Sequence, residues 1–185
     1  MSSTPSTVLV TGPSRSGKSE WAERLAAGYE HGGHIVTYVA TSILDSSNRE
    51  WAERVERHRQ RRPPSWKTCH VPTDLPSTIQ TAGEMECLLI DSLGTWLANG
   101  LDANEDQWAQ QQQGLLDAIA HSCCTLIVVA EETGWGVVPA YPAGRLFRDR
   151  LGTLTRHVGA IADTTYLVTA GHVLNLSALG IHLDT

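Results

Sequence analysis

The chain has 185 residues, a formal net charge of −6 at pH 7 and 41% hydrophobic residues. This length suits one domain with a full hydrophobic core, and the acidic balance argues against general nucleic-acid binding. No apolar run approaches the roughly 20 residues needed to span a bilayer, and the N-terminus lacks the features of a signal peptide. We therefore predict a cytoplasmic protein without a membrane span, folded as a single domain over residues 1–185, in which residues 1–6 are flexible.

A phosphate-binding loop follows the first predicted strand. Val8–Thr11 is apolar and β-branched, and it precedes the pattern G-x-x-x-x-G-K-S and a predicted helix, Glu20–Ala27. In this context the backbone N–H groups of the loop and the positive end of the helix dipole bind phosphate. Lys18 would reach the β- and γ-phosphates, and the Ser19 hydroxyl would hold Mg²⁺. The loop comprises Gly12, Pro13, Ser14, Arg15, Ser16, Gly17, Lys18 and Ser19.

A second buried strand is predicted at His34–Ala40, after glycines between residues 28 and 33 that end the first helix. The intervening helix makes this a βαβ unit with two parallel strands. Thr41 and Ser42 then stand at the carboxyl end of the strand, where ligands bind in open α/β sheets.

A highly charged helix is predicted from Arg49 to about Arg61, stopped by two prolines. Five of the 14 basic residues of this acidic chain fall between residues 54 and 62. Helical spacing places His58 on one face with arginines that suit phosphate oxygens. Neighbouring positive charge would keep the imidazole neutral and therefore nucleophilic. The alternative is a solvated face stabilised by Glu–Arg pairs four residues apart.

A third apolar strand ends in a carboxylate. Glu86–Ser92 contains Cys87–Ile90 followed by Asp91, and it comes after a short strand at residues 65–71 and a helix that ends near residue 82. A strand-end aspartate commonly completes a phosphate-loop site by holding Mg²⁺. Asp91 could instead cap the helix predicted from Leu93 to Asn99, and both roles are compatible.

Another pair of carboxylates follows the buried strand Thr125–Ala130, which comes after a helix predicted from Gln107 to His121. Glu131, Glu132 and the glycine-flanked Trp135 resemble a site loop. Equally, the glutamates could be solvent-facing charges and Trp135 a packing residue. The sequence leaves these alternatives open.

The last part of the chain predicts a helix and a hairpin. In the helix, from Tyr141 to about Ala160, Phe147 and three further apolar residues recur at helical spacing and should face the core. Its arginines (Arg145, Arg148, Arg150 and Arg156) could reach phosphate, a partner subunit or only water, and water is the default expectation. Residues 163–170 and 172–176 flank Gly171 as a hairpin. The four cysteines lack C-x-x-C spacing, which indicates reduced core or near-core thiols.

Taken together, these motifs resemble the bifunctional adenosylcobinamide kinase / adenosylcobinamide-phosphate guanylyltransferases of cobalamin biosynthesis. The resemblance covers nearly the whole chain, and the phosphate loop alone would be shared with many kinases. More specific are R-V-x-x-H-R-x-x-R-P-x-x-W-x-T from Arg54 to Thr68 and E-x-G-x-G-V-V-P from Glu132 to Pro139.

This resemblance implies an α/β P-loop NTPase fold of the RecA-like kind, with a mostly parallel central sheet flanked by helices and a C-terminal antiparallel hairpin. It also implies a homo-oligomer, specifically a trimer. The implied substrates are adenosylcobinamide and the nucleoside triphosphates ATP and GTP, with Mg²⁺ as cofactor. The first reaction phosphorylates the aminopropanol hydroxyl, and the second transfers GMP from GTP through a guanylylated histidine.

The residues implied by this resemblance can be given position by position. His58 and Lys18 would be catalytic, and Ser19 and Asp91 would hold the metal. The implied nucleotide contacts are residues 12–19 together with Ala40, Thr41, Ser42, Arg59, Gln60, Arg61, Arg62 and Asp91.

Two positions depart from the family pattern. His70 stands where members usually carry glutamate, and Glu131 stands where asparagine is common. Neither residue carries the phosphate chemistry, so the expected activity is unchanged. Two other functions remain open at this point: a small-molecule kinase with a single activity, and a regulatory module that binds GTP without transferring anything.

Overall fold

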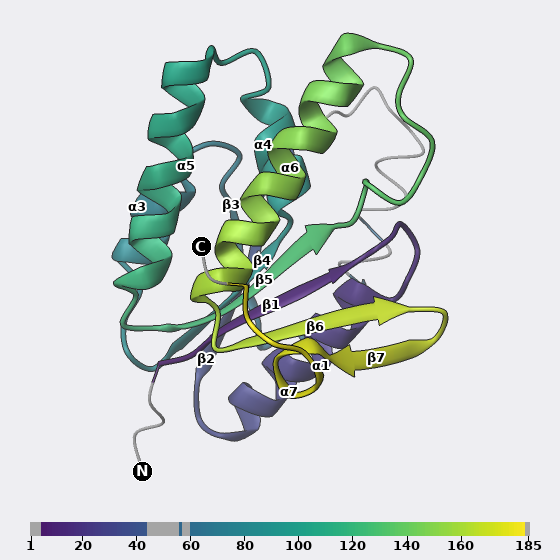
Figure 1. Ribbon diagram of the computed structural model, residues 1–185. Coiled ribbons are helices and arrows are strands. Elements are labelled where there is room, and N and C mark those ends of the chain that lie inside the picture. Colours follow the sequence, from purple (N-terminus) through teal and green to yellow (C-terminus); the bar gives the residue numbers. More distant parts are fainter. Residues whose placement is uncertain (1–4, 44–55, 57–59, 184–185) are drawn as a thin grey trace.

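A single seven-stranded sheet organises the computed structural model, which describes residues 5–43, 56 and 60–183. The strands run in the order β3-β2-β4-β5-β1-β6-β7, and every neighbouring pair is parallel except β6 and β7. The expected P-loop fold, with a mostly parallel sheet and a C-terminal hairpin, is therefore confirmed (Figure 1).

The strands are short and joined by helices in most cases. The strands are β1 (Thr7–Gly12), β2 (Ile35–Ala40), β3 (Lys67–His70), β4 (Glu86–Asp91), β5 (Thr125–Glu131), β6 (Thr164–Thr169) and β7 (His172–Asn175). The helices are α1 (Lys18–His31), α3 (Leu75–Gln80), α4 (Leu93–Asn99), α5 (Glu105–Ala120), α6 (Pro142–Ile161) and α7 (Leu176–Leu179).

The sheet separates two hydrophobic cores. Figure 1 shows α1 on one face and α3, α4, α5 and α6 on the other. Along β1, Val8 and Val10 pack into the core on the α1 side, whereas Leu9 packs into the core on the α6 side. This alternation is the period of two that a strand imposes on its side chains. A strand covered on both faces reads as a continuous apolar run, and β4 and β5 have the same character.

The topology brings several loops to one edge of the sheet. Strands β1, β2, β4 and β5 are parallel, so the segments that follow them all begin at their shared carboxyl edge. In open α/β sheets this edge is where ligands bind. The phosphate loop, residues 41–43, the start of α4 and the loop after Glu131 therefore converge on one region.

Some local predictions were wrong. The first helix continues through Gly28 to His31 and ends at Gly32. Cys87 and Cys124 are buried as free thiols, but Cys69 and Cys123 are exposed, so not all four cysteines belong to the core.

The predicted face of α6 is confirmed with one exception. Leu151, Leu154 and Val158 are buried, and Phe147 packs against them. Arg150 was expected to face water but is only 6% exposed. Its guanidinium donates to the carbonyl oxygens of Leu101 and Ala103 at 3.1 and 2.8 Å and forms an ion pair with Glu105 at 3.3 Å, so the buried charge has partners. Within the described ranges, no helix is long and apolar enough to cross a membrane.

Candidate nucleotide-binding site

The phosphate loop begins at the point where β1 ends. A side chain on Gly12 would drive its Cβ into the carbonyl oxygen of Val168 in β6 and place it 2.8 Å from Ser16 Oγ. Gly17, the N-cap of α1, has φ of 93°, a left-handed conformation that side chains disfavour. Both glycines are therefore required by the path of the chain. The expected strand, loop and helix order is observed.

Two loop side chains are buried within this turn. Lys18 is 6% exposed, and its Nζ donates to the carbonyl oxygen of Pro13 at 3.3 Å, which holds the ammonium group over the loop. Ser16 Oγ is also buried, and it has no hydrogen-bond partner in the part of the chain that the structure describes. A buried hydroxyl without a partner is costly, and a phosphate oxygen would satisfy it.

Asp91 lies at the carboxyl end of β4 and accepts a hydrogen bond from the hydroxyl of Tyr38 at 2.9 Å. Burial, followed by the nearby charge of Asp91, raises the pKa of Tyr38, so the phenol stays protonated and continues to donate. Asp91 does not cap the next helix, because Ser92 is the N-cap of α4 and accepts from the backbone N–H of Thr95. The cap alternative for Asp91 was therefore wrong.

Thr41 is fully buried and joins the end of β2 to the start of α4. Its hydroxyl accepts from the backbone N–H of Ser92 at 2.9 Å and donates to the carbonyl oxygen of Ser92 at 2.7 Å. Its own carbonyl oxygen accepts from the side chain of Asn99 at 2.7 Å. The hydroxyl that was expected near nucleotide thus has a role in the fold, while Ala40 and Ser42 flank it at the carboxyl edge.

The end of the arginine-rich segment lies against α1. Arg61 forms ion pairs with Glu20 at 3.0 Å and with Glu23 at 3.1 Å, both in the first turns after the loop. The guanidinium of Arg62 stacks over the ring of Tyr38, 3.7 Å from its centroid. The structure thus brings the two arginines, Tyr38 and the phosphate loop into one region. Gln60 hydrogen-bonds to Glu56, and His58 and Arg59 lie outside the described residues.

The carboxyl group of Glu23 is also affected by this arrangement. Burial raises the pKa of its carboxyl group, and the charge and hydrogen bond of Arg61 oppose that rise. Arg61 therefore compensates a largely buried carboxylate on the helix that follows the loop. This pairing was not predicted, because it joins residues 38 positions apart.

The two strand-end glutamates have different environments. Glu131 accepts from the hydroxyl of Ser92 at 2.5 Å and from the backbone N–H of Gly94 at 3.0 Å, at the N-terminus of α4. It is therefore a structural acceptor rather than a solvent-facing charge. Glu132 is partly buried; its backbone N–H donates to the carbonyl oxygen of Gly12 at 2.8 Å, and its carboxylate accepts from the backbone N–H of Gly134. Trp135, by contrast, is largely exposed.

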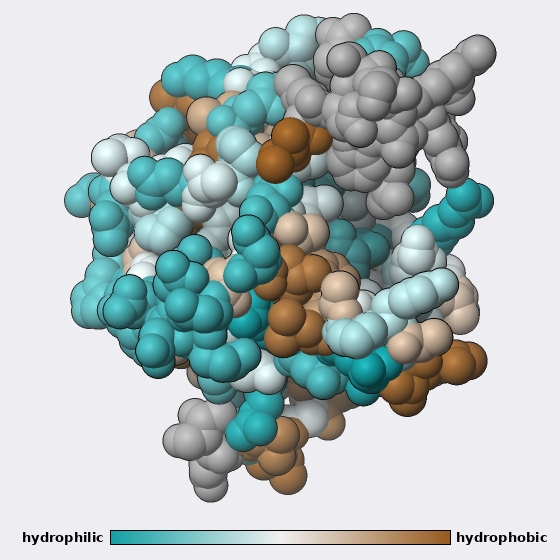
Figure 2. Space-filling view, turned by 90° about the horizontal axis from the view of Figure 1, so that it is seen from above, coloured by the Kyte–Doolittle hydropathy of each residue, from teal (hydrophilic) through white to brown (hydrophobic). Residues whose placement is uncertain are grey.

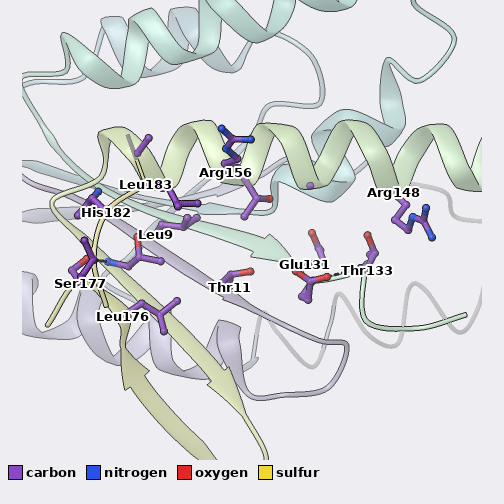
Figure 3. Close-up of a pocket in the computed structure, with 18 residues that line it drawn as sticks. Leu9, Thr11, Glu131, Thr133, Arg148, Arg156, Leu176, Ser177, His182 and Leu183 are labelled. Carbon is purple, nitrogen blue, oxygen red and sulfur yellow. Dashed lines mark hydrogen bonds between the residues drawn. The ribbon is translucent and has the colours of Figure 1, made fainter. Parts of the chain in front are cut away.

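A cavity of about 410 Å³ lies beside the loop that follows β5, on the α6 side of the sheet (Figure 3). Its floor is formed by β1 and β6, its roof by α6, and its far end by α7 and the C-terminal segment. Glu131 and Thr133 lie at the carboxyl end of the cavity, and Ser177 and His182 lie at the other end (Figure 3). No sequence motif indicated this cavity, because it forms between segments more than a hundred residues apart.

The oxygen atoms near the loop suit a magnesium ion held together with substrate phosphates. Mg²⁺ prefers oxygen ligands and is usually held by one or two protein groups plus phosphate. The Ser19 hydroxyl, in the first turn of α1, and the Asp91 carboxylate, at the end of β4, are oxygen donors of this kind. Among residues 5–43, 56 and 60–183, no group of three or more histidine, cysteine or acidic side chains could hold a metal by itself.

Comparison with known proteins relates this chain to one family of enzymes. Residues 8–176 match the model of the family described as cobinamide kinase / cobinamide phosphate guanyltransferase. A protein of Pseudomonas aeruginosa, bifunctional adenosylcobalamin biosynthesis protein CobP, is 35% identical over 165 residues, which are 88% of this chain and 92% of that protein. The Escherichia coli protein CobU, of the same description, is 34% identical over 180 residues, covering 89% and 96% of the two chains.

Solved structures agree on the fold alone. The flagellar accessory protein FlaH of Methanocaldococcus jannaschii superimposes with a TM-score of 0.52 at 15% identity, over 97% of this chain and 83% of that one. A second solved structure, an ATPase domain, gives a TM-score of 0.51 at 13% identity, over 88% of this chain and 68% of that one.

Proposed function

Because the chain belongs to the cobinamide kinase / cobinamide phosphate guanyltransferase family, we propose that it phosphorylates adenosylcobinamide and then guanylylates the product. A nucleoside triphosphate supplies the first phosphoryl group, and GTP supplies GMP in the second step, giving adenosylcobinamide-GDP. The observation that carries this proposal is the phosphate loop, in which Lys18 is buried and Ser16 has an unsatisfied hydroxyl within the described residues.

Nucleotide binding would use groups that lie around the loop. The backbone N–H groups of residues 12–19 and the ammonium of Lys18 would hold the phosphates, because together they form a positive concavity at a helix N-terminus. Ser19 and Asp91 would hold Mg²⁺, which neutralises phosphate charge when bound. Ala40, Thr41, Ser42 and Arg59–Arg62 remain predicted nucleotide contacts. Arg61 supports this because its ion pairs hold it against α1, the helix that follows the loop.

In the kinase step, the acceptor hydroxyl attacks the γ-phosphorus and the bond to the β–γ bridging oxygen breaks. Little covalent chemistry is required of the protein, so positioning and charge stabilisation dominate the rate. Lys18 would stabilise the charge that develops on the transferred group.

In the guanylyl step, the neutral imidazole of His58 would attack the α-phosphorus of GTP and release pyrophosphate. The phosphate of the first product then displaces the imidazole from the phosphoramidate, which completes the transfer of GMP. Arginines of the same segment would stabilise the charge on phosphorus and on pyrophosphate.

We also propose that the protein acts in the cytoplasm as a homotrimer. Large apolar side chains are exposed in the loop after β5 and in the C-terminal segment, and Val137 and Ile181 are 95% and 96% exposed. Apolar residues gather in several patches on the face shown in Figure 2. Surfaces of this kind commonly mark contacts between subunits.

Labelling with GTP carrying a radioactive α-phosphate tests the transfer chemistry. We expect the protein to acquire an acid-labile, alkali-stable label, and His58→Ala to acquire none. His121→Ala is a matched control, because His121 is exposed at the end of α5 and should label normally. Lys18→Met should lose both labelling and cobinamide phosphorylation.

The outcomes separate the alternative functions. Phosphorylation of cobinamide by a protein that takes no label would indicate a kinase with a single activity. A protein that binds GTP but performs neither reaction would be a nucleotide-dependent binding module, and the proposal would be wrong.

A further inference from the structure

The cavity beneath α6 adjoins the phosphate loop. Thr11, which lines the cavity, is the last residue before Gly12, the first residue of the loop. Glu132 lines the same cavity, and its backbone N–H donates to the carbonyl oxygen of Gly12 at 2.8 Å. The carboxyl end of the cavity therefore adjoins the start of the phosphate loop.

One face of α6 creates the hollow. Its lining residues recur at intervals of three and four, as one helical face does, and they include Gly152, Gly159 and Ala160. A Cβ added to Gly152 would meet no atom within 4 Å. Small residues thus leave space on a helix whose opposite face is packed with leucine.

The walls of the cavity suit an aliphatic chain that carries polar groups. Leu9 and Leu176 supply apolar surface. The hydroxyl oxygens of Thr11 and Thr155 are buried there and, within the described part of the chain, have no hydrogen-bond partner. Buried hydroxyls without partners are costly, so rotation of either threonine side chain toward the alcohol or amide of a ligand would be favourable.

The volume restricts what can enter. About 410 Å³ is at the small end of the range for ligand pockets, so the cavity suits a small molecule or one arm of a larger one. The proposed acceptor has such an arm, an aliphatic amide that ends in the alcohol to be phosphorylated.

We propose that this cavity binds the alcohol-bearing arm of the corrinoid and that Glu132 accepts the proton of its hydroxyl. This inference rests on the proposed kinase function. The hydroxyl oxygen forms a bond to the γ-phosphorus, the bond from phosphorus to the bridging oxygen breaks, and the nucleoside diphosphate leaves with that electron pair. The hydroxyl proton passes to the carboxylate of Glu132.

Glu132 is better suited to this role than the adjacent Glu131. Both oxygens of Glu131 are engaged at the start of α4, by Ser92 and by Gly94. Glu132 lies at the mouth of the cavity, and only one of its oxygens has a contact in the described residues, with the backbone N–H of Gly134. A base must be within reach of the proton that it takes, so the position of Glu132 favours it.

Filling the cavity tests the binding site. Gly152→Leu places a large side chain in open space and also favours the helix, so the fold should be preserved. We expect the KM for adenosylcobinamide to rise by at least about tenfold, because the arm can no longer take its place. The KM for nucleotide and the α-phosphate labelling of the enzyme should not change.

Gly114→Leu is the matched control, because Gly114 lies in α5, its added Cβ also meets nothing, and it does not line the cavity. A cobinamide KM in Gly152→Leu within twofold of wild type would overturn the proposed site. A change in oligomeric state with an unchanged KM would show that a second copy of the chain fills the cavity, and this would also overturn it.

Glu132→Gln tests the proton acceptor. Glutamine keeps the carbonyl oxygen that accepts from Gly134 but cannot take a proton. We expect kcat for phosphorylation to fall by about 100-fold. The dependence of kcat on a basic group at low pH should also disappear, whereas labelling of the enzyme from GTP should be retained. An unchanged kcat and pH profile would overturn the role of Glu132.

A direct binding measurement separates this inference from the proposed function. If equilibrium dialysis shows that cobinamide binds wild type and Gly114→Leu but not Gly152→Leu, the cavity is the binding site even if no phosphorylation occurs. If wild type phosphorylates cobinamide and all three proteins bind it equally, the proposed function stands and the inference fails.

Discussion

Arg61 shows how one residue of the charged segment serves the fold. Its guanidinium contacts Glu20 and Glu23, and Glu23 is largely buried beside it. Exposed ion pairs contribute little to stability, but a carboxylate that has lost water depends more on its partner. Arg61 therefore combines a structural role in the free protein with a predicted contact to nucleotide.

We expect Arg61→Gln to destabilise the protein by about 1 kcal/mol at neutral pH and by less in acid. Burial raises the pKa of Glu23 in the folded protein above its unfolded value of 4.5, so ionisation of Glu23 opposes folding. The contribution of Glu23 to the free energy of unfolding is therefore fully present below pH 4.5 and declines as the pH rises through the folded pKa. Removing Arg61 should raise that pKa further. The loss should therefore grow between pH 4.5 and neutrality.

Urea unfolding across this pH range, without nucleotide, measures the effect. Arg148→Gln is the matched control, because Arg148 pairs only with the neighbouring, exposed Asp149 among the described residues. A loss for Arg61→Gln that does not vary with pH would contradict the assignment to Glu23.

The thiols should divide into two classes. Cys69 and Cys123 are exposed, whereas Cys87 and Cys124 are buried. Burial raises the pKa of Cys87 to about 12, so its thiolate is scarce at neutral pH. In the native protein we expect Cys69 and Cys123 to react with a thiol reagent within minutes and the other two only after unfolding. Mass spectrometry of the modified peptides would identify them, and rapid modification of Cys87 would contradict the fold.

Among single residues, the sequence predicted those whose role is local. Gly12, Gly17 and Lys18 occupy their expected places because the loop is a contiguous motif. Tyr38 was missed as a partner of Asp91 because the two are 53 residues apart and only the register of β2 and β4 aligns them. Pairs of this kind depend on tertiary structure, which no local pattern encodes.

At the scale of elements, α4 is secured by a residue from another strand. Glu131, at the end of β5, accepts from the backbone N–H of Gly94 in the first turn of α4. A carboxylate at this position also interacts favourably with the helix dipole. Gly94 permits the contact, since a Cβ there would collide with Oε2 of Glu131.

We expect Glu131→Ala to lower the free energy of unfolding by about 1 to 2 kcal/mol, as loss of a helix cap does. Gly94→Ala should destabilise as well, because the added methyl group displaces Glu131. Denaturant unfolding of both single variants and the double variant measures the coupling. If the loss in the double variant equalled the sum of the two single losses in the free energy of unfolding, this contact would be contradicted. Once either residue is changed, the change at the other should cost less.

The elements themselves were largely predictable, but their contacts were not. Apolar runs marked β1, β4 and β5, and turn residues marked the final hairpin. The sequence did not show that β6 joins β1 in parallel, so that the hairpin extends the main sheet and Val168 closes over the loop. The helical pattern also ended α1 too early, because packing on the sheet outweighs the low helix propensity of Gly28.

At the scale of the whole molecule, the C-terminal segment exposes apolar side chains beside an edge strand. Leu179 is largely exposed, and β7 ends the sheet. An unprotected edge with apolar neighbours favours association with another copy. The predicted trimer would cover this region.

Sedimentation equilibrium should give three times the chain mass of 20.1 kDa for wild type. Leu179→Asp should weaken association by at least about tenfold, because it buries a charge in the contact. Met85→Asp is the control, since Met85 is also exposed but precedes β4 far from β7 in sheet order. A monomeric wild type would contradict the trimer. If Leu179→Asp associates as strongly as wild type, the contact between subunits lies elsewhere.

The alternation along β1 has a consequence for how such an enzyme can diversify. Val8 and Val10 support the helix that follows the phosphate loop, while Leu9 and Thr11 form the floor of the cavity under α6. Substitutions in α6 can therefore reshape the acceptor pocket without disturbing the packing that positions the nucleotide. Selection, or a protein engineer, could alter which alcohol is phosphorylated while the phosphate donor stays the same.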